Sequence, residues 1–250
     1  MATIVAISSF VMRGTVGLRP ILFALERRGH TVVAVPTVLL PWHPGLGQST
    51  RTVPGALGAQ LSEIAARVRP DGILTGYFAS AEDVAAAARF IDAARGDAPV
   101  LVDPVSADAG GPYVPEPVRD ALFQTLIPRA SVLTPNRAEA ALFGLGSGAQ
   151  AVVVTSAQER EGTLTSRLVA GGKACAFSHA KAASAPNGTG DLSAALILAG
   201  LVEGQTLADA THDALAATVA VVDASDGPDL ALGAAQDALV APPRGRVTRR

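Results

Sequence analysis

The segment 187–191, with the sequence Asn-Gly-Thr-Gly-Asp, combines a backbone suited to anions with a carboxylate. It runs directly into the apolar stretch 192–198, so we expect it to form the turn that opens a helix. Free amides at a helix start, together with the helix dipole, attract phosphate, and the two glycines let a ligand come close. A carboxylate repels phosphate, so the presence of Asp191 here needs a reason, and one reason is general-base catalysis on a hydroxyl that attacks phosphorus. A carboxylate that caps the helix is the alternative interpretation.

Other polar residues follow apolar runs that have the composition of strands. Asp103 precedes a proline and can hold a magnesium ion or its water, although Asp-Pro is also an ordinary turn. Asn136 and Glu139 are three residues apart, so on a helix they share one face and can order water around a metal-bound phosphate. An acidic first helical turn is the alternative for this pair. Thr155 and Ser156 can contact nucleotide phosphates or simply begin a turn.

The N-terminal part of the chain carries a second glycine turn and an aromatic loop. Gly14 and Gly17 flank a turn into a helix, but neither a dinucleotide fingerprint nor a Walker A sequence is present there. The segment 36–58 is rich in proline and glycine and long for a connection, which indicates a functional loop. It contains Trp42 and His43, and an aromatic side chain there can cover a flat ring, with local packing as the alternative.

Short apolar runs alternate with helical stretches rich in Ala and Leu along the whole chain. Continuous apolar strands between helices predict a parallel sheet that is covered on both faces. We therefore expect one doubly wound α/β domain with a mostly parallel central sheet, and ligands beyond the carboxyl ends of its strands. Two glycines within 166–177 predict a hairpin. The expected strands are 4–7, 31–35, 72–75, 100–102, 131–133, 151–155, 166–170 and 174–177, and the last expected helix is 230–240.

Composition and charge narrow the class of protein. The 250 residues are 49% hydrophobic, which is ample for a core, and a net charge of −2 excludes nucleic acid as an expected partner. We expect residues 1–241 to form the domain and the basic residues 242–250 to form a disordered tail. Cys175 is the only cysteine, so no internal disulfide is expected. With neither a signal peptide nor a membrane span recognised, we expect a cytoplasmic protein with no membrane partner.

Taken together and in order, these motifs resemble pyridoxal kinases, which form the vitamin-kinase branch of the ribokinase superfamily. The resemblance covers nearly the whole chain. It implies a ribokinase-like fold, ATP-dependent phosphorylation of the 5'-hydroxymethyl group of pyridoxal in vitamin B6 salvage, ATP and Mg²⁺ as cofactors, and a homodimer. The matching segments are Ser-x-Val at 9–11, Gly-x-x-Gly at 14–17, Thr-Val at 37–38, His43, Gly-Tyr at 76–77, Asp-Pro-Val at 103–105, Thr-Pro-Asn at 134–136 with Glu139, and Gly-Thr-Gly-Asp at 188–191.

The resemblance also implies roles for individual residues. Asp191 would be the base, and the amides of Gly188, Thr189 and Gly190 would form the anion hole. Asp103 and Glu139 would act through magnesium and its waters. The nucleotide side would comprise Asp103, Thr134, Asn136, Glu139, Thr155 and Ser156. The pyridoxal side would comprise Ser9, Val11, Thr37, His43, Pro44, Gly45, Tyr77 and Asp191.

Some positions depart from the family pattern. Leu18 stands where most relatives have Asn, and Pro44 replaces a Thr. The connection 144–150 lacks a helix that relatives carry, and the loop between 177 and 188 is short, so we expect a second copy of the chain to cover the surface left open. Two alternative functions remain. One is hydroxymethylpyrimidine kinase, whose family typically has Cys at the position of Asp191, and the other is a non-catalytic vitamin B6-binding or regulatory protein on a kinase scaffold.

Overall fold

A mixed β-sheet runs through the molecule in the computed structural model, which describes residues 1–146, 148, 150–183 and 185–250. Within these residues the sheet has nine strands in the order β11-β10-β9-β8-β7-β4-β3-β1-β2. The strands from β2 to β8 pair in parallel, and those from β8 to β11 pair antiparallel. Their bounds are β1 (Thr3–Arg13), β2 (Thr31–Trp42), β3 (Gly72–Thr75), β4 (Val100–Val102), β7 (Val132–Leu133), β8 (Ala151–Arg160), β9 (Thr163–Ala170), β10 (Lys173–Ala180) and β11 (Thr248–Arg249).

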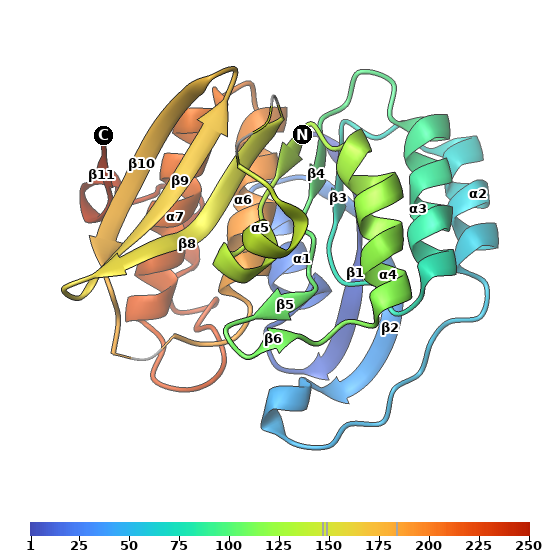
Figure 1. The fold of residues 1–250 in the computed structure, drawn as a ribbon, viewed down its shortest axis with the longest axis horizontal. Helices are drawn as coiled ribbons and strands as arrows, with labels where there is room; N and C mark the ends of the chain where they lie inside the picture. The colour runs from blue at the N-terminus through green and yellow to red at the C-terminus, as the bar shows by residue number, and fades with distance from the viewer. Residues whose placement is uncertain (147, 149, 184) are drawn as a thin grey trace.

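Helices cover both faces of this sheet, as Figure 1 shows. One face packs against α1 (Leu18–Arg27), α6 (Thr189–Val202) and α7 (Leu207–Asp223). The other packs against α2 (Leu57–Arg67), α3 (Ala81–Ala94), α4 (Glu116–Ala121) and α5 (Arg137–Phe143), and α4 continues into a π-helical turn (Leu122–Leu126) and a 3-10 turn (Ile127–Arg129). Because side chains alternate along a strand, Ile4 and Ala6 enter the first core while Val5 and Ile7 enter the second. The predicted doubly wound fold is confirmed.

The parallel strands end along one rim, where β1 and β2 point downwards in Figure 1 and a small hairpin of β5 (Ala107–Asp108) and β6 (Gly111–Pro112) also lies. The predicted hairpin near the end of the sheet is confirmed. Gly171 and Gly172 link β9 to β10 with φ of +55° and +76°, the left-handed conformations that a two-residue turn needs. In the described part of the chain, no helix has both the length and the apolar character to cross a membrane.

The edge strand β2 is longer than its sequence suggests, and it replaces the first part of the loop predicted for 36–58. The register between β1 and β2 shifts beside Pro36, and pairing then resumes as far as Trp42. Beyond the shift, Val38 and Leu40 are buried on one side. On the outer side, Leu39 exchanges both backbone hydrogen bonds with Thr52, at 2.8 and 3.0 Å. The strand therefore continues because its alternate side chains, Val38 and Leu40, are buried in a small apolar cluster.

The helix predicted for 230–240 is wrong, since only Gln236–Leu239 forms a short 3-10 turn. Leu230 and Leu232 are both buried, and side chains two residues apart share a direction in an extended chain rather than in a helix. The backbone N–H of Leu230 instead donates to the hydroxyl of Thr15 at 2.7 Å. This bond ties the segment to the N-terminal glycine turn.

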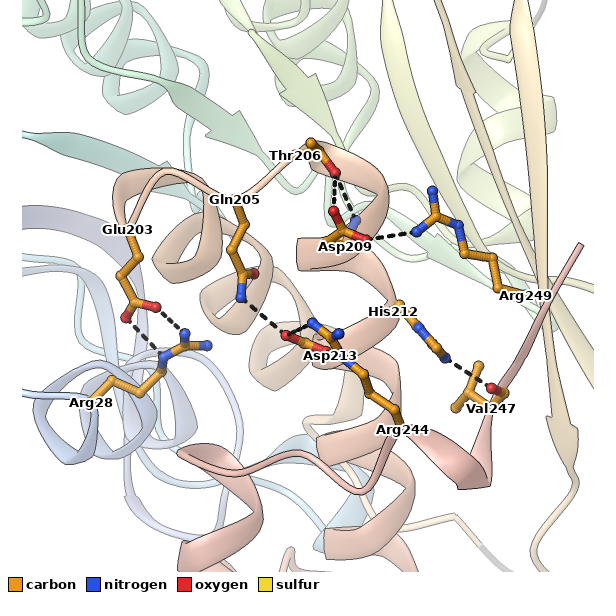
Figure 2. Close-up of polar contacts among 10 residues, drawn as sticks. All are labelled: Arg28, Glu203, Gln205, Thr206, Asp209, His212, Asp213, Arg244, Val247 and Arg249. Carbon is orange, nitrogen blue, oxygen red and sulfur yellow. Dashed lines mark hydrogen bonds and ion pairs between the residues drawn. The ribbon is translucent and has the colours of Figure 1, made fainter.

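The basic segment 242–250, predicted to be a disordered tail, joins the sheet through β11. Val247 is buried, and Arg244 and Arg249 form ion pairs with carboxylates of α7, as Figure 2 shows. The ion pairs with these acidic residues, which are distant in sequence, explain why residues 242–250 are ordered. Two other predicted features, the short connection 144–150 and the short loop after Phe177, include residues 147, 149 and 184, which lie outside the described residues.

Candidate active site

The turn before α6 packs directly against the N-terminal glycine turn. Gly188 has a φ of +92°, and a Cβ atom there would collide with the carbonyl oxygen of Thr15. Gly17 has a φ of +60°, and a Cβ atom there would collide with Ser9. Two glycine turns from opposite ends of the sequence therefore meet, and neither tolerates a side chain. Their contact brings the amino end of α6 to the carboxyl end of β1.

Asp191 lies in the first turn of α6, partly buried between these two turns. Its Oδ2 accepts a hydrogen bond from the backbone N–H of Gly17 at 2.9 Å, so the carboxylate reaches across to the other turn. Burial raises the pKa of Asp191 to about 6, although the hydrogen bonds from Gly17 and from its own backbone N–H oppose this shift. A carboxylate with this pKa is ionised at neutral pH yet basic enough to accept a proton from a hydroxyl.

Asp103 follows β4 and faces the amino end of α6. Its Oδ2 lies 4.0 Å from the position that a Cβ atom on Gly190 would take, and the residue is buried. Burial, followed by the nearby carboxylates of Glu139 and Asp191, holds the pKa of Asp103 well above its usual range. Such a group of carboxylates favours a divalent cation. No three acidic, His or Cys side chains among the described residues are arranged to hold a metal together.

Asn136 and Glu139 form a capping box at the start of α5, the arrangement left open as the alternative for this pair. The Oε2 of Glu139 accepts from the backbone N–H of Asn136, and its Oε1 accepts from that of Ser106, both at 2.9 Å. The side-chain amide of Asn136 donates to the carbonyl oxygen of Ala107 at 2.8 Å. Burial raises the pKa of Glu139 despite these backbone bonds. Both side chains thus hold the segment that follows Asp103.

A cavity of about 200 Å³ extends from the amino end of α6 along the antiparallel strands. Thr155 and Ser156 line it together with Thr189 and Gly190, so these predicted residues are brought together. Ser156 has a φ of +48°, and its backbone N–H donates to the hydroxyl of Ser166 at 3.1 Å. Thr134 and Asn136, although described, are not among the lining residues of this cavity.

Residues predicted for the pyridoxal side gather on the other side of Asp191. The hydroxyl of Thr37 donates to the carbonyl oxygen of Tyr77 at 2.7 Å. The Tyr77 ring packs against a small apolar cluster that includes Val11. The Oδ1 of Asp191 lies 4.0 Å from the position of a Cβ atom on Gly76. Ser9 is buried, and its backbone and hydroxyl lie directly against Gly17, so these side chains predicted for the vitamer come from β1, β2 and the residues just after β3.

His43, Pro44 and Gly45 lie farther out, at the start of a 3-10 turn (Pro44–Leu46). The Nδ1 of His43 accepts from the backbone N–H of Gly45 at 3.2 Å. Burial lowers the pKa of His43, and the carboxylate of Asp229 acts in the opposite direction. His43 is therefore a neutral hydrogen-bonding group at physiological pH, while Pro44 and Gly45 are exposed.

Sequence reasoning missed three residues near this side. The Ser8 hydroxyl accepts from the backbone N–H of Tyr77 at 3.2 Å, and the doublet with Ser9 could have indicated it. The Arg51 guanidinium lies over the Tyr77 ring, 5.4 Å from its centre. Asp229 lies beside the glycine turn and close enough to His43 to affect its pKa. The last two come from segments without a motif.

Comparison with known proteins gives consistent matches. Residues 24–233 match the phosphomethylpyrimidine kinase family. The chain is 33% identical to the pyridoxine/pyridoxal/pyridoxamine kinase of Bordetella avium over 82% of this chain and 79% of that protein. It is 30% identical to a pyridoxal kinase of Rubrobacter xylanophilus over 96% and 94% of the two chains. The structure of pyridoxal kinase from Entamoeba histolytica superposes over the full length of both chains, with a TM-score of 0.87 and 20% identity. The structure of a Leishmania donovani pyridoxal kinase in complex with ADP and pyridoxamine superposes with a TM-score of 0.86 and 22% sequence identity, again over the full length of both chains.

The chain therefore belongs to the phosphomethylpyrimidine kinase family and has the ribokinase-like fold. The curated relatives just described are kinases of pyridoxal and related vitamers, and the chain is a kinase similar to them. The resemblance drawn from the ordered motifs is confirmed for family and fold. The roles of individual site residues stay predictions.

Proposed function

We propose that this protein transfers the γ-phosphoryl group of ATP to the 5'-hydroxymethyl group of pyridoxal or a related B6 vitamer. The observation that carries the proposal is the Asp191 carboxylate, which lies beside the free amides of α6 and has a pKa of about 6. The curated relatives, which are named as kinases of pyridoxal, pyridoxine and pyridoxamine, support the choice of substrate. Neighbouring structures that contain ADP or an ATP analogue support the choice of nucleotide.

In this mechanism Asp191 accepts the proton of the hydroxymethyl group as the oxygen of that group attacks the γ-phosphorus of ATP and ADP leaves. The amides of Gly188, Thr189 and Gly190 stabilise the charge on the transferred phosphoryl group, because they are fixed before the reaction begins. Asp103 is the carboxylate available to hold Mg²⁺, since both oxygens of Glu139 already accept backbone hydrogen bonds. When bound, Mg²⁺ neutralises phosphate charge.

The two substrates would lie on opposite sides of Asp191. The cavity lined by Thr155 and Ser156 takes the nucleotide, because it opens from the same amides that bind the transferred group. The apolar surface around Tyr77 takes the vitamer ring, which is flat and aromatic. A neutral His43 can hydrogen-bond a polar substituent of that ring without adding charge.

The test is an ADP-release assay with purified protein, ATP, Mg²⁺ and each of four acceptors: pyridoxal, pyridoxine, pyridoxamine and hydroxymethylpyrimidine. We expect turnover with a B6 vitamer and a fall of roughly 100- to 10,000-fold in the Asp191→Asn variant, the usual range for loss of a general base. Calorimetry should give similar ADP affinity for both proteins, because Asn keeps the volume and a hydrogen-bond acceptor.

Hydroxymethylpyrimidine kinase is the second candidate, favoured by the name of the matched family. Exclusive use of hydroxymethylpyrimidine in the four-acceptor assay would replace the first proposal by this one. A protein that binds pyridoxal but consumes no ATP with any acceptor would instead support a non-catalytic vitamin B6-binding role. Lost ADP affinity with unchanged turnover in Asp191→Asn would assign Asp191 to ground-state binding.

A further inference from the structure

Among the elements that line the cavity assigned to the nucleotide, β10 and α7 form two walls that are separated in sequence. One wall is formed by the end of β10 and the residues after it, including His179 and Lys181. The other is formed by the second half of α7, from Leu215 to its last residue, Asp223. β10 and α7 pack on each other through the rings of Phe177 and His212, whose centres lie 6.0 Å apart, and any further connection between them bears on the width of the cavity.

Residues 242–250 are attached to the first wall through the backbone. Thr248 pairs with Ser178 in the antiparallel ladder of β10 and β11. Arg250 and Ala176 exchange two further hydrogen bonds, at 2.8 and 2.9 Å. These contacts end next to His179, so they fix β10 just before it enters the cavity wall.

The same residues are attached to the second wall through side chains. The acceptors and donors on α7 lie at 209, 212 and 213, and residues with this spacing share one face of a helix. Figure 2 shows these contacts side by side. They are Arg249 to Asp209 at 2.8 Å, His212 Nε2 to the carbonyl oxygen of Val247 at 2.8 Å, and Arg244 Nη2 to Asp213 at 2.8 Å.

A fourth contact reaches the cavity itself. Arg246 forms an ion pair with Asp223, which lines the cavity at the end of α7. A carboxylate at the carboxyl end of a helix is unfavourable because of the helix dipole, and beside a polyanion it is more so. Arg246 therefore neutralises the negative charge of Asp223, which would otherwise repel an anionic ligand in the cavity.

We propose that residues 242–250 form a clasp that holds the two walls of the nucleotide cavity, with Arg246 as the positioning residue that acts through Asp223. The cavity's assignment to a nucleoside di- or triphosphate rests on the proposed function. The clasp connects β10 and α7, and among the described residues its only ion pair with the cavity lining is that of Arg246 with Asp223.

The test compares Arg246→Asp with a double variant that exchanges the charges, Arg246→Asp with Asp223→Arg. In Arg246→Asp, two carboxylates repel each other at the rim. We expect the Kd for ADP, measured by calorimetry, and the KM for ATP to rise about 3- to 10-fold, as the loss and reversal of one exposed ion pair predicts. The turnover number and the KM for pyridoxal should stay within about 2-fold, and the exchanged pair should bring ADP affinity back towards that of the parent.

The matched control is Arg129→Asp, which breaks a comparable surface pair with Asp92 on the other face of the sheet. It should leave ADP affinity unchanged. Unchanged ADP affinity in Arg246→Asp, or an equal loss for ADP and pyridoxal, would overturn the clasp, as would a parent protein that binds no ADP. Selective loss of ADP affinity in a protein without phosphoryl transfer would support the clasp while the proposed function fails.

Discussion

Replacement of Asp191 by Asn should make the folded protein more stable at neutral pH. The pKa of this carboxyl rises from 3.8 to about 6 on folding, because burial penalises the charged form. The folded state therefore binds the proton of Asp191 more tightly than the unfolded state does. The stability that this protonation adds is complete below about pH 4 and is lost as the pH rises through about 6. A shift of about two units corresponds to at most ~3 kcal/mol at pH 7. Asn carries no charge to desolvate, and its side-chain oxygen can still accept from Gly17.

Thermal melts of parent and variant at pH 4 and pH 7 test this expectation. At pH 7 the variant should melt up to ~10 °C higher, since 1 kcal/mol is worth about 2–4 °C in a domain of this size. At pH 4 the two melting temperatures should coincide. Asp92→Asn is a control in which the melting temperature at pH 7 should fall instead of rise, because the hydrogen bond from Arg129 lowers the pKa of Asp92 and so favours its charged form in the folded state. A variant at Asp191 that is less stable than the parent at pH 7, or a difference independent of pH, would refute the reasoning.

Three further predictions concern neighbouring features. Gly188→Ala should cost at least about 2 kcal/mol in urea denaturation, because its φ is positive and the new Cβ atom meets Thr15, and an unchanged midpoint would contradict this. Asp103→Asn should raise the Mg²⁺ concentration for half-maximal rate roughly 10-fold, and an unchanged requirement would remove Asp103 from the ion site. We propose a homodimer through the exposed ring of Phe123, which stacks on the buried ring of Phe143, so light scattering should give twice the chain mass of 25.2 kDa for the parent and less for Phe123→Ser. A monomeric parent would contradict this interface.

Local sequence signals predicted the centre of the sheet better than its margins. β3 and β4 have the predicted limits, because each is a short run in the middle of the sheet with aspartate, glycine or proline on either side. The segment 242–250 could not be predicted in this way. Its order depends on acidic partners on α7, including Asp209 and Asp213, that only the tertiary structure brings close.

The same contrast holds for the site. Asp103 follows a strand and Asp191 lies in the first turn of a helix, and because such ends share one rim in a parallel sheet, the sequence predicts that these two carboxylates approach each other. The spacing of Asn136 and Glu139 predicted a shared helix face. It could not show that both oxygens of Glu139 are occupied by backbone N–H groups, since one donor, Ser106, lies 33 residues away.

The outer margin of β2 bears on the behaviour of the protein in concentrated solution. An uncovered edge strand offers unpaired N–H and C=O groups to strands of other molecules, which is a route to fibrillar aggregates. Here Leu39 already bonds Thr52 through both groups, and by alternation the next outward position is Pro41, which has no N–H to donate. The last part of β2 therefore resists growth of the sheet from one molecule into the next, and folded copies that meet there must associate through side chains rather than through added strands.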